Sequence, residues 1–205
     1  MQKIITFAEK YRTRSTRILA IILTTLVFFT HHSWERLTVI DTLCEVIGLF
    51  LIGICVMGRL WASVYMAGNK RNELVMVGPY SLMRHPLYSF SLLGAAGIGF
   101  LTENIFALFT IISVFIFHYY LVVLAEERDM IKIHGEAYKE YMKHIPRRFI
   151  PNFAHYREPE QFSVNTKVYR KSFLDAVWFI WGMIPIEIIE RLHEMGTLPV
   201  LFRLP

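Results

Sequence analysis

Residues 87–125 read LYSFSLLGAAGIGFLTENIFALFTIISVFIFHYYLVVLA, and this stretch decides the fold. Its two apolar runs, Leu87–Leu101 and Ile105–Ala125, are separated only by the tripeptide Thr-Glu-Asn at 102–104. A helix crosses a bilayer with about 20 consecutive apolar residues, so the second run is long enough to span and the first is short. Because the turn between them is so tight, the two runs predict a helical hairpin whose free ends emerge on the same side of a membrane.

The composition favours an all-α polytopic membrane protein. Apolar residues make up 54% of the 205 residues and charged residues 19%, whereas soluble domains average about 45–50% and about 25%. Three more apolar segments lie at about Arg17–His32, Val39–Ala67 and Phe173–Ile189. We therefore expect a single membrane domain, residues 1–205, with about five transmembrane or membrane-embedded helices.

Within that domain, the sequence divides into N-terminal spans (1–70), a central core (71–153) and a C-terminal tail (154–205). The first apolar segment follows a basic arm, as in a signal peptide, but no small-residue cleavage site comes after it, so we expect an uncleaved span. The fifth segment, in the tail, is interrupted by Asp175, Pro185 and Glu187. Its sequence leaves open whether it crosses the bilayer, lies at the interface or re-enters.

The basic residues predict an orientation. They gather in the N-terminal arm, between the second and third apolar segments, and after the fourth. Because Lys and Arg concentrate in cytosolic loops, the N-terminus and the polar stretches 68–86 and 126–170 are expected to face the cytosol. This bias explains the pI of about 9.2, so no nucleic-acid partner is expected. Cys44 and Cys55 lie too far apart on one helix for a disulfide, about 16 Å, and no metal-ligand spacing involves them.

Three charged pairs are expected to lie close together at this face: Arg84-His85 before the third segment, Glu126-Glu127 after the fourth, and Arg147-Arg148 after a short Tyr-rich helix. The hairpin brings the first two pairs to the same side. Such a cluster suits a polar ligand of mixed charge, since Arg binds a carboxylate and Glu binds an ammonium or sulfonium. The same residues would also serve as interfacial anchors, and the pattern alone does not decide between the two.

Residues 78–88, GPYSLMRHPLY, resemble the R-H-P-x-Y signature of the isoprenylcysteine carboxyl methyltransferase family. Residues 126–151 resemble the E-E…G-x-x-Y-x-x-Y…P ending of the same family, and the related phospholipid N-methyltransferases share the E-E element. The resemblance implies a methyltransferase with S-adenosylmethionine as its cofactor, bound in a cytosolic pocket. Its acceptor would be a lipophilic or amphiphilic carboxylate, amine or thiol at the membrane face.

The resemblance also implies roles for individual residues. Those that would bind the cofactor are Tyr80, His85, Pro86, Tyr88, Glu126, Glu127, Tyr138, Tyr141 and Arg148. Arg84 and Glu127 would be the catalytic residues: Arg84 would position an anionic acceptor, whereas an amine acceptor would need a Glu to take its proton. Methyl transfer is an in-line displacement, so the protein mainly has to align the reactants and exclude water.

Two ionisable residues inside the apolar segments are further candidates for acceptor binding. Arg59 lies in the second segment, nearer its cytosolic end, and His118 lies two turns before Glu126. Ionisable residues within a membrane are costly and are often functional. Alternatively, Arg59 would snorkel to the interface and His118 would form a hydrogen bond to a neighbouring helix.

Two other functions are weighed against methyl transfer. Residues 127–151 also resemble the C-terminal end of the sterol reductases, which use a nicotinamide cofactor, NADPH. Those proteins have more spans, and the pairing of Arg84-His85-Pro86 with Glu126-Glu127 fits the methyltransferase better. A non-catalytic membrane adaptor would tolerate the loss of Arg84 or Glu127. The sequence names neither the methyl acceptor nor the oligomeric state.

Overall fold

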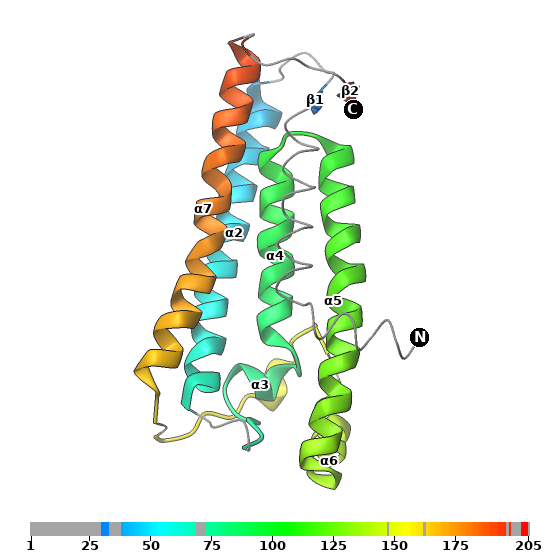
Figure 1. The fold of residues 1–205 in the computed structure, drawn as a ribbon, viewed down its shortest axis with the longest axis vertical. Helices are drawn as coiled ribbons and strands as arrows, with labels where there is room; N and C mark the ends of the chain where they lie inside the picture. The colour runs from blue at the N-terminus through cyan, green and yellow to red at the C-terminus, as the bar shows by residue number, and fades with distance from the viewer. Residues whose placement is uncertain are drawn as a thin grey trace.

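In the computed structural model, the protein is described over residues 30–32, 38–68, 73–146, 148–161, 163–195, 197 and 202–204. The long helices are α2 (Thr38–Gly68), α4 (Pro86–Leu101), α5 (Ile105–His134) and α7 (Thr166–Glu194). The short elements are α3 (Pro79–Leu82), α6 (Glu136–His144), the 3-10 turn η1 (Phe153–His155) and the parallel pair β1 (Thr30–His32) and β2 (Phe202–Leu204). The long helices run side by side, with α3 and α6 at one end and the strands at the other (Figure 1).

The predicted hairpin is confirmed. α4 ends at Leu101 and α5 begins at Ile105. The Oδ1 atom of Asn104 accepts a hydrogen bond of 2.9 Å from the Ala107 N–H, which satisfies a free donor in the first turn of α5. Glu103 has a φ of 49°, the left-handed conformation that completes the reversal of the chain.

α4 is the central helix, because it packs along both α2 and α5 and also contacts α7. Its glycines allow the close approach to α2: a Cβ at Gly97 would lie 2.7 Å from the Gly48 carbonyl oxygen, and one at Gly94 would lie 2.5 Å from Cys55 Sγ. Small residues at such a crossing let two helix backbones pack directly, which is a common device in membranes. This packing holds the N-terminal end of α4, which carries the R-H-P-x-Y motif, against α2.

Three helices of the described chain are long and apolar enough to cross a membrane, over Val39–Ala67, Ile105–His134 and Thr166–Ile189. α4 is apolar but shorter, as its sequence predicts. Large apolar side chains point outward from the bundle, for example Phe117 at 69% exposure and Trp178 at 70%. An outer surface of this kind is suited to lipid rather than water. The prediction of an all-α membrane protein is therefore confirmed.

Two predicted segments differ from the observed elements. The first, Arg17–His32, lies outside the described residues except for Thr30–His32, which form β1 and not the end of a helix. The fifth, Phe173–Ile189, is too short: α7 extends beyond it at both ends and continues through Pro185. An apolar run marks only the part of a helix that faces the membrane. The polar turns before Phe173 were therefore not included in the predicted segment.

Candidate functional site

The R-H-P-x-Y motif occupies the sharp bend between α3 and α4. Gly78 precedes α3 with a φ of 59°, and a Cβ there would lie 2.4 Å from the ring of Tyr65, so this turn requires glycine. Met83 then extends the chain, and Pro86 starts α4 at a position where its missing N–H costs no hydrogen bond. The bend leaves Arg84 and His85 at the foot of α4.

Residues 148–157, which we call the strap, cross this bend and are bonded to it through the backbone. Three hydrogen bonds join the two segments: His85 N–H to Arg148 C=O at 3.0 Å, Asn152 N–H to Leu82 C=O at 3.0 Å, and Gly78 N–H to Arg157 C=O at 2.7 Å. The strap is thus held at its start, middle and end. It fixes Arg148 next to the motif, although the two are far apart in sequence.

Glu127 is the centre of a buried charge cluster. Its side chain is 7% exposed, and its carboxylate accepts hydrogen bonds of 2.9–3.2 Å from the Arg148 guanidinium. Arg84 Nη1 lies 3.1 Å from the same carboxylate, and His85 Nε2 lies 3.2 Å from it. Arg84 also donates to the Pro146 carbonyl at 3.0 Å. With two guanidinium groups and an imidazole around it, Glu127 anchors the cluster and raises the pKa of Arg148 through their hydrogen bond.

Glu126, the next residue, is in a different environment. Its side chain is 32% exposed, and its Oε1 accepts a hydrogen bond of 2.5 Å from the Tyr88 hydroxyl. His85 Nδ1 lies 4.0 Å from its other oxygen. The two adjacent glutamates therefore lie in different environments. Glu127 is buried among cations, whereas Glu126 is oriented by a tyrosine and can be reached from solvent.

Three buried tyrosines close the cluster. Tyr138 and Tyr141 lie on the buried face of α6, and the Tyr141 hydroxyl donates to the Tyr80 carbonyl at 2.7 Å. Burial, followed by the nearby charge of Glu127, raises the pKa of Tyr138 to about 12, and burial also raises the pKa of Tyr80 and Tyr141. All three phenols therefore stay protonated at neutral pH. The Tyr80 hydroxyl is buried and has no hydrogen-bond partner within the described chain.

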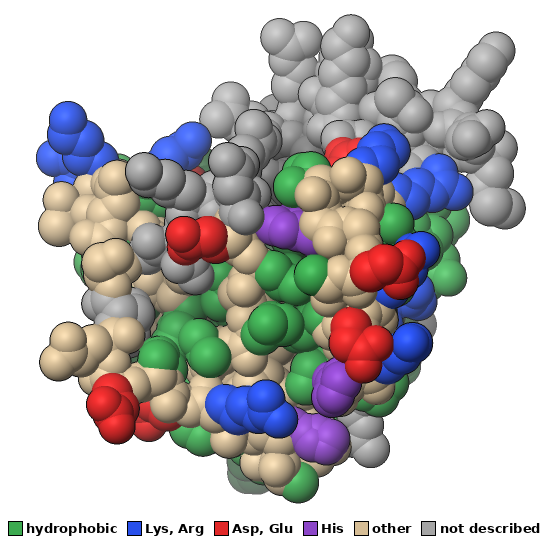
Figure 2. Space-filling view, turned by 90° about the horizontal axis from the view of Figure 1, so that it is seen from below, with side chains coloured by type: hydrophobic (Ala, Val, Ile, Leu, Met, Phe, Trp, Pro, Cys, Tyr) green, Lys and Arg blue, Asp and Glu red, His purple; other side chains and the backbone are tan. Residues whose placement is uncertain are grey.

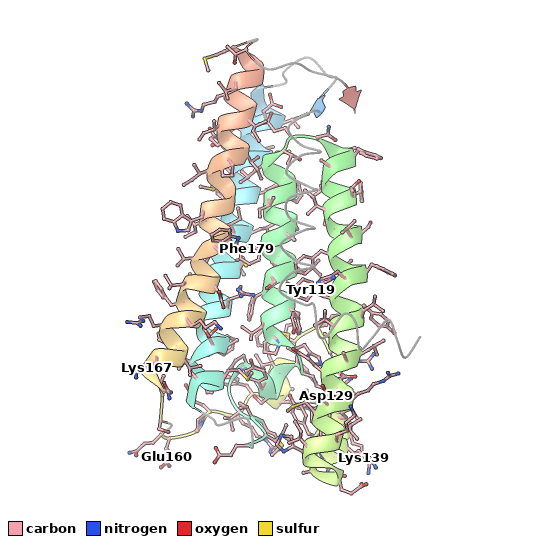
Figure 3. The ribbon with its side chains drawn as sticks, viewed as in Figure 1. Tyr119, Asp129, Lys139, Glu160, Lys167 and Phe179 are labelled. Carbon is pink, nitrogen blue, oxygen red and sulfur yellow. The ribbon has the colours of Figure 1, made fainter. Side chains whose placement is uncertain are left out.

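An aromatic stack continues from Tyr88 along α5. The Tyr88 ring lies 4.8 Å from that of Tyr119, which stacks on Phe115 at 4.2 Å. His118 packs edge-on against Tyr119, with ring centroids 5.2 Å apart. Figure 3 shows Tyr119 between α4 and α5, above Asp129 of α5. His118 thus lies beside this stack and outside the charge cluster.

Arg59 is likewise apart from the charge cluster. It lies on α2 and donates to the hydroxyl of Ser91 on α4. Its guanidinium carbon lies 5.4 Å from the centre of the Phe179 ring, which α7 supplies. Figure 3 shows Phe179 at the junction of α7 with the neighbouring helices. The structure therefore brings nine predicted site residues and Arg84 together around the foot of α4, and it leaves Arg59 and His118 at greater membrane depth.

The end of the molecule that carries this site is polar. Figure 2 views it directly and shows Lys, Arg, Asp, Glu and His side chains around a central patch of hydrophobic ones. Among the residues that the structure describes, no three His, Cys, Asp or Glu side chains are arranged to hold a metal ion. The Glu127 carboxylate at this end is instead paired with Arg84, His85 and Arg148.

A model of the phospholipid methyltransferase family matches residues 46–137, which include the motif and both glutamates. The cobalt-zinc-cadmium resistance protein CzcN of Cupriavidus metallidurans is 30% identical over 192 residues, 94% of this chain and 88% of that protein. This chain belongs to the phospholipid methyltransferase family. The family falls within the isoprenylcysteine carboxyl methyltransferase-like group of membrane methyltransferases, so the predicted resemblance is confirmed.

A second relative is similar to this chain over nearly its whole length. The nickel-cobalt-cadmium resistance protein NccN of Alcaligenes xylosoxydans xylosoxydans is 27% identical over 199 residues, 97% of this chain and 92% of that protein. No solved structure gives a significant match. The similarity to both relatives extends past the residues that the family model matches and includes the strap and α7.

Sequence reasoning missed the serines that attach the strap. Ser81 Oγ accepts a hydrogen bond of 2.9 Å from the Arg157 N–H and donates to the Gly78 carbonyl at 2.7 Å. Ser89 Oγ donates to the Phe149 carbonyl at 2.8 Å. Both serines lie within or next to the motif, and their position at helix starts was the available signal. Their partners in the strap, 60 or more positions away, could not be read from the sequence.

Replacing Tyr88 with Phe should lower the free energy of unfolding by about 1.5–3 kcal/mol, because a hydrogen bond to a charged carboxylate is lost while the ring stays packed on Tyr119. Denaturant unfolding in detergent measures this. Tyr169→Phe is the matched control, since its hydroxyl makes no hydrogen bond within the described chain, and it should change stability by less than about 0.5 kcal/mol. Equal effects of the two substitutions would contradict the assigned role of the Tyr88 hydroxyl.

Proposed function

We propose that this chain is an S-adenosylmethionine-dependent methyltransferase that binds its cofactor against Glu126 and Arg148. The observation that carries the proposal is the contrast between the two adjacent glutamates. Glu127 is enclosed by Arg84, His85 and Arg148, whereas Glu126 is 32% exposed and oriented by Tyr88. A purely structural cluster would have no need of the second, accessible carboxylate.

The residues fit the charges of such a cofactor, which carries a carboxylate, an ammonium and a sulfonium. Arg148 is 35% exposed and is able to meet a carboxylate while it keeps Glu127. Glu126 is placed to meet a cation. The Tyr80 hydroxyl and Arg84 Nε are buried and lack hydrogen-bond partners within the described chain. Buried polar atoms are normally satisfied, so these two atoms favour a site that a ligand completes.

When bound, S-adenosylmethionine supplies a methyl group on positively charged sulfur, which a nucleophile attacks in line. The protein's own residues then have three tasks. Tyr88 holds Glu126 in one orientation, the Glu127 cluster fixes Arg84 and Arg148, and the strap covers the foot of α4. Positioning and exclusion of water are the main sources of rate in such a displacement. We further propose that this end faces the cytosol, on the strength of its Lys and Arg content.

S-adenosylhomocysteine should raise the unfolding temperature of the purified protein, and NADPH should not. A ligand at 100 times its dissociation constant stabilises the folded state by about 2.7 kcal/mol, which is well above the noise of a thermal scan. Stabilisation by NADPH alone would favour the reductase and reject the methyltransferase. Stabilisation by neither ligand, in protein that unfolds cooperatively, would favour the adaptor.

The names of the two relatives suggest a physiological setting. Those proteins are named for resistance to cobalt, zinc, cadmium or nickel. For this chain we propose that methyl transfer to a membrane component accompanies exposure to such ions. Growth of a deletion strain on cadmium, complemented with the wild type or with Glu126→Gln, separates a role that needs the site from one that does not.

A further inference from the structure

The strap carries a group of large, exposed apolar side chains. Ile150 is 67% exposed, Phe153 is 74% exposed, and Tyr156 is 41% exposed. Phe153 and Tyr156 lie three residues apart across the 3-10 turn η1, a spacing that puts two side chains on the same side of such a turn. Large apolar side chains grouped on a surface usually mark a contact with a partner or with a membrane. The position of the strap relative to the helices indicates which of these it is.

Two contacts place the strap at the level of the membrane helices. Ser89, in the first turn of α4, donates through its Oγ to the Phe149 carbonyl at 2.8 Å. The Tyr156 ring packs against that of Trp61 on α2, with ring centroids 6.2 Å apart. Trp61 lies about 10 Å before the end of α2, at 1.5 Å per residue. In Figure 1 the yellow segment after α6 passes beside α3 and reaches the foot of α4, so the strap runs at the depth where the apolar helices end.

The side chains around the strap are of the kinds found at a membrane interface. Trp61 also packs edge-on against Phe90 of α4, with ring centroids 6.4 Å apart, so that α2, α4 and the strap share one aromatic group. Trp and Tyr are enriched where the hydrocarbon meets the headgroups. His155 and Arg157 are exposed on either side of Tyr156, and Arg pairs well with phosphate groups. Apolar and basic side chains therefore occur together in the strap, as they do in segments that lie in the interface plane.

We propose that the strap binds the bilayer interface, with Ile150 and Phe153 inserted among the lipid chains and Arg157 at the headgroup phosphates. Lipid is the occupant that the surroundings favour. The Tyr156 contact joins the exposed surface of the strap to α2, which is long and apolar enough to cross the membrane. The outward side chains of α2, such as Met57 at 73% exposure, are suited to lipid, and the strap continues that surface.

The same contact would hold the strap on the R-H-P-x-Y motif. The Asn152 N–H donates to the Leu82 carbonyl, and the His85 N–H donates to the Arg148 carbonyl, each at 3.0 Å. A short segment that has such bonds but few buried side chains opens easily. Insertion of Phe153 into lipid adds the apolar burial that the protein does not supply. The bilayer therefore stabilises the closed strap, whether or not a cofactor binds beneath it.

Photocrosslinking tests the contact with the full chain in nanodiscs of phosphatidylethanolamine and phosphatidylglycerol. Benzoylphenylalanine replaces Phe153, and the intact mass after irradiation reports which molecule it touches. We expect an adduct of one lipid, at a yield comparable to that from position Trp178, which is 70% exposed on α7. Position Glu160 should give no lipid adduct, because it is exposed at the lower end of the molecule, below the first turn of α7 (Figure 3). A yield as low as that from Glu160, or an adduct with a second copy of the chain, would overturn the proposal.

Hydrogen exchange in the same nanodiscs tests whether lipid holds the strap closed. In Phe153→Ser the Asn152 amide should exchange at least about 5-fold faster than in the wild type, because the apolar burial is lost. Ile188→Ser and Arg191→Gln are controls at the far end of α7. The first also removes an exposed apolar side chain, and the second removes one member of an exposed ion pair with Glu187. Both controls should leave the Asn152 amide unchanged. The same exchange rate in Phe153→Ser and in the wild type would contradict a stabilising role for the bilayer.

Discussion

Replacing Glu127 with Leu should lower the free energy of unfolding by about 3–5 kcal/mol, the usual cost of removing one partner from a buried ion pair. The loss is large because Arg84 and His85, each 8% exposed, would keep their polar groups in the interior without the carboxylate that neutralises them. Gln, which still accepts a hydrogen bond, should cost less. Denaturant unfolding in detergent gives the difference.

Glu140→Leu is the matched control for that substitution. Glu140 forms an ion pair with Lys143 on the exposed face of α6, and such surface pairs contribute about 0–1 kcal/mol. If Glu127→Leu were as mild as Glu140→Leu, the Glu127 cluster would not be the anchor of the site. Hydrogen exchange of the strap is a second measurement. The backbone amides of the strap should exchange faster in Glu127→Leu, because Arg148 loses its partner.

Replacing Gly97 with Ala should destabilise the bundle by about 1–3 kcal/mol, the usual cost of overpacking. The added Cβ would lie 2.7 Å from the Gly48 carbonyl oxygen and 3.1 Å from the Ile52 backbone nitrogen, and backbone atoms cannot move aside singly. Leu at the same position should be worse and should separate α4 from α2. The change in unfolding midpoint measures both effects.

Gly53→Ala on α2 is the control for Gly97, since a Cβ at Gly53 meets nothing within 4 Å. Ala is the better helix former, so this variant should be neutral or more stable by up to about 1 kcal/mol. The opposite signs of the two substitutions are the critical result. Stabilisation by Gly97→Ala would show that the α2–α4 crossing is looser than the structure has it.

Local sequence signals were sufficient for the hairpin and its motif. The Thr-Glu-Asn turn, Pro86 and Gly135 each act within one or two turns of helix, and the elements begin and end where these residues predict. The hairpin alone implies that Arg84-His85 meets Glu126-Glu127, because both lie at its free ends. The sequence alone therefore predicts that these groups lie close together.

Which side chains pair with one another inside the site could not be predicted from the sequence in the same way. Glu127 pairs with two arginines, whereas Glu126 accepts a hydrogen bond from Tyr88. This difference depends on the side of α5 that each glutamate faces and on the place where the strap crosses the motif. The strap returns through hydrogen bonds between backbone groups, which carry no side-chain signature. The length of α7 was likewise missed, because its polar turns lie outside the apolar run from which it was predicted.

The central claim is that the foot of α4 binds S-adenosylmethionine, and equilibrium dialysis of the tritium-labelled cofactor against nanodisc-held protein tests it most directly. We predict saturable binding by the wild type and by Arg191→Gln, and at least a 10-fold loss of affinity in Glu126→Gln, which keeps the Glu127 cluster intact. Folded wild-type protein that shows no saturable binding, or a Glu126→Gln variant that binds as tightly as the wild type, would contradict the account.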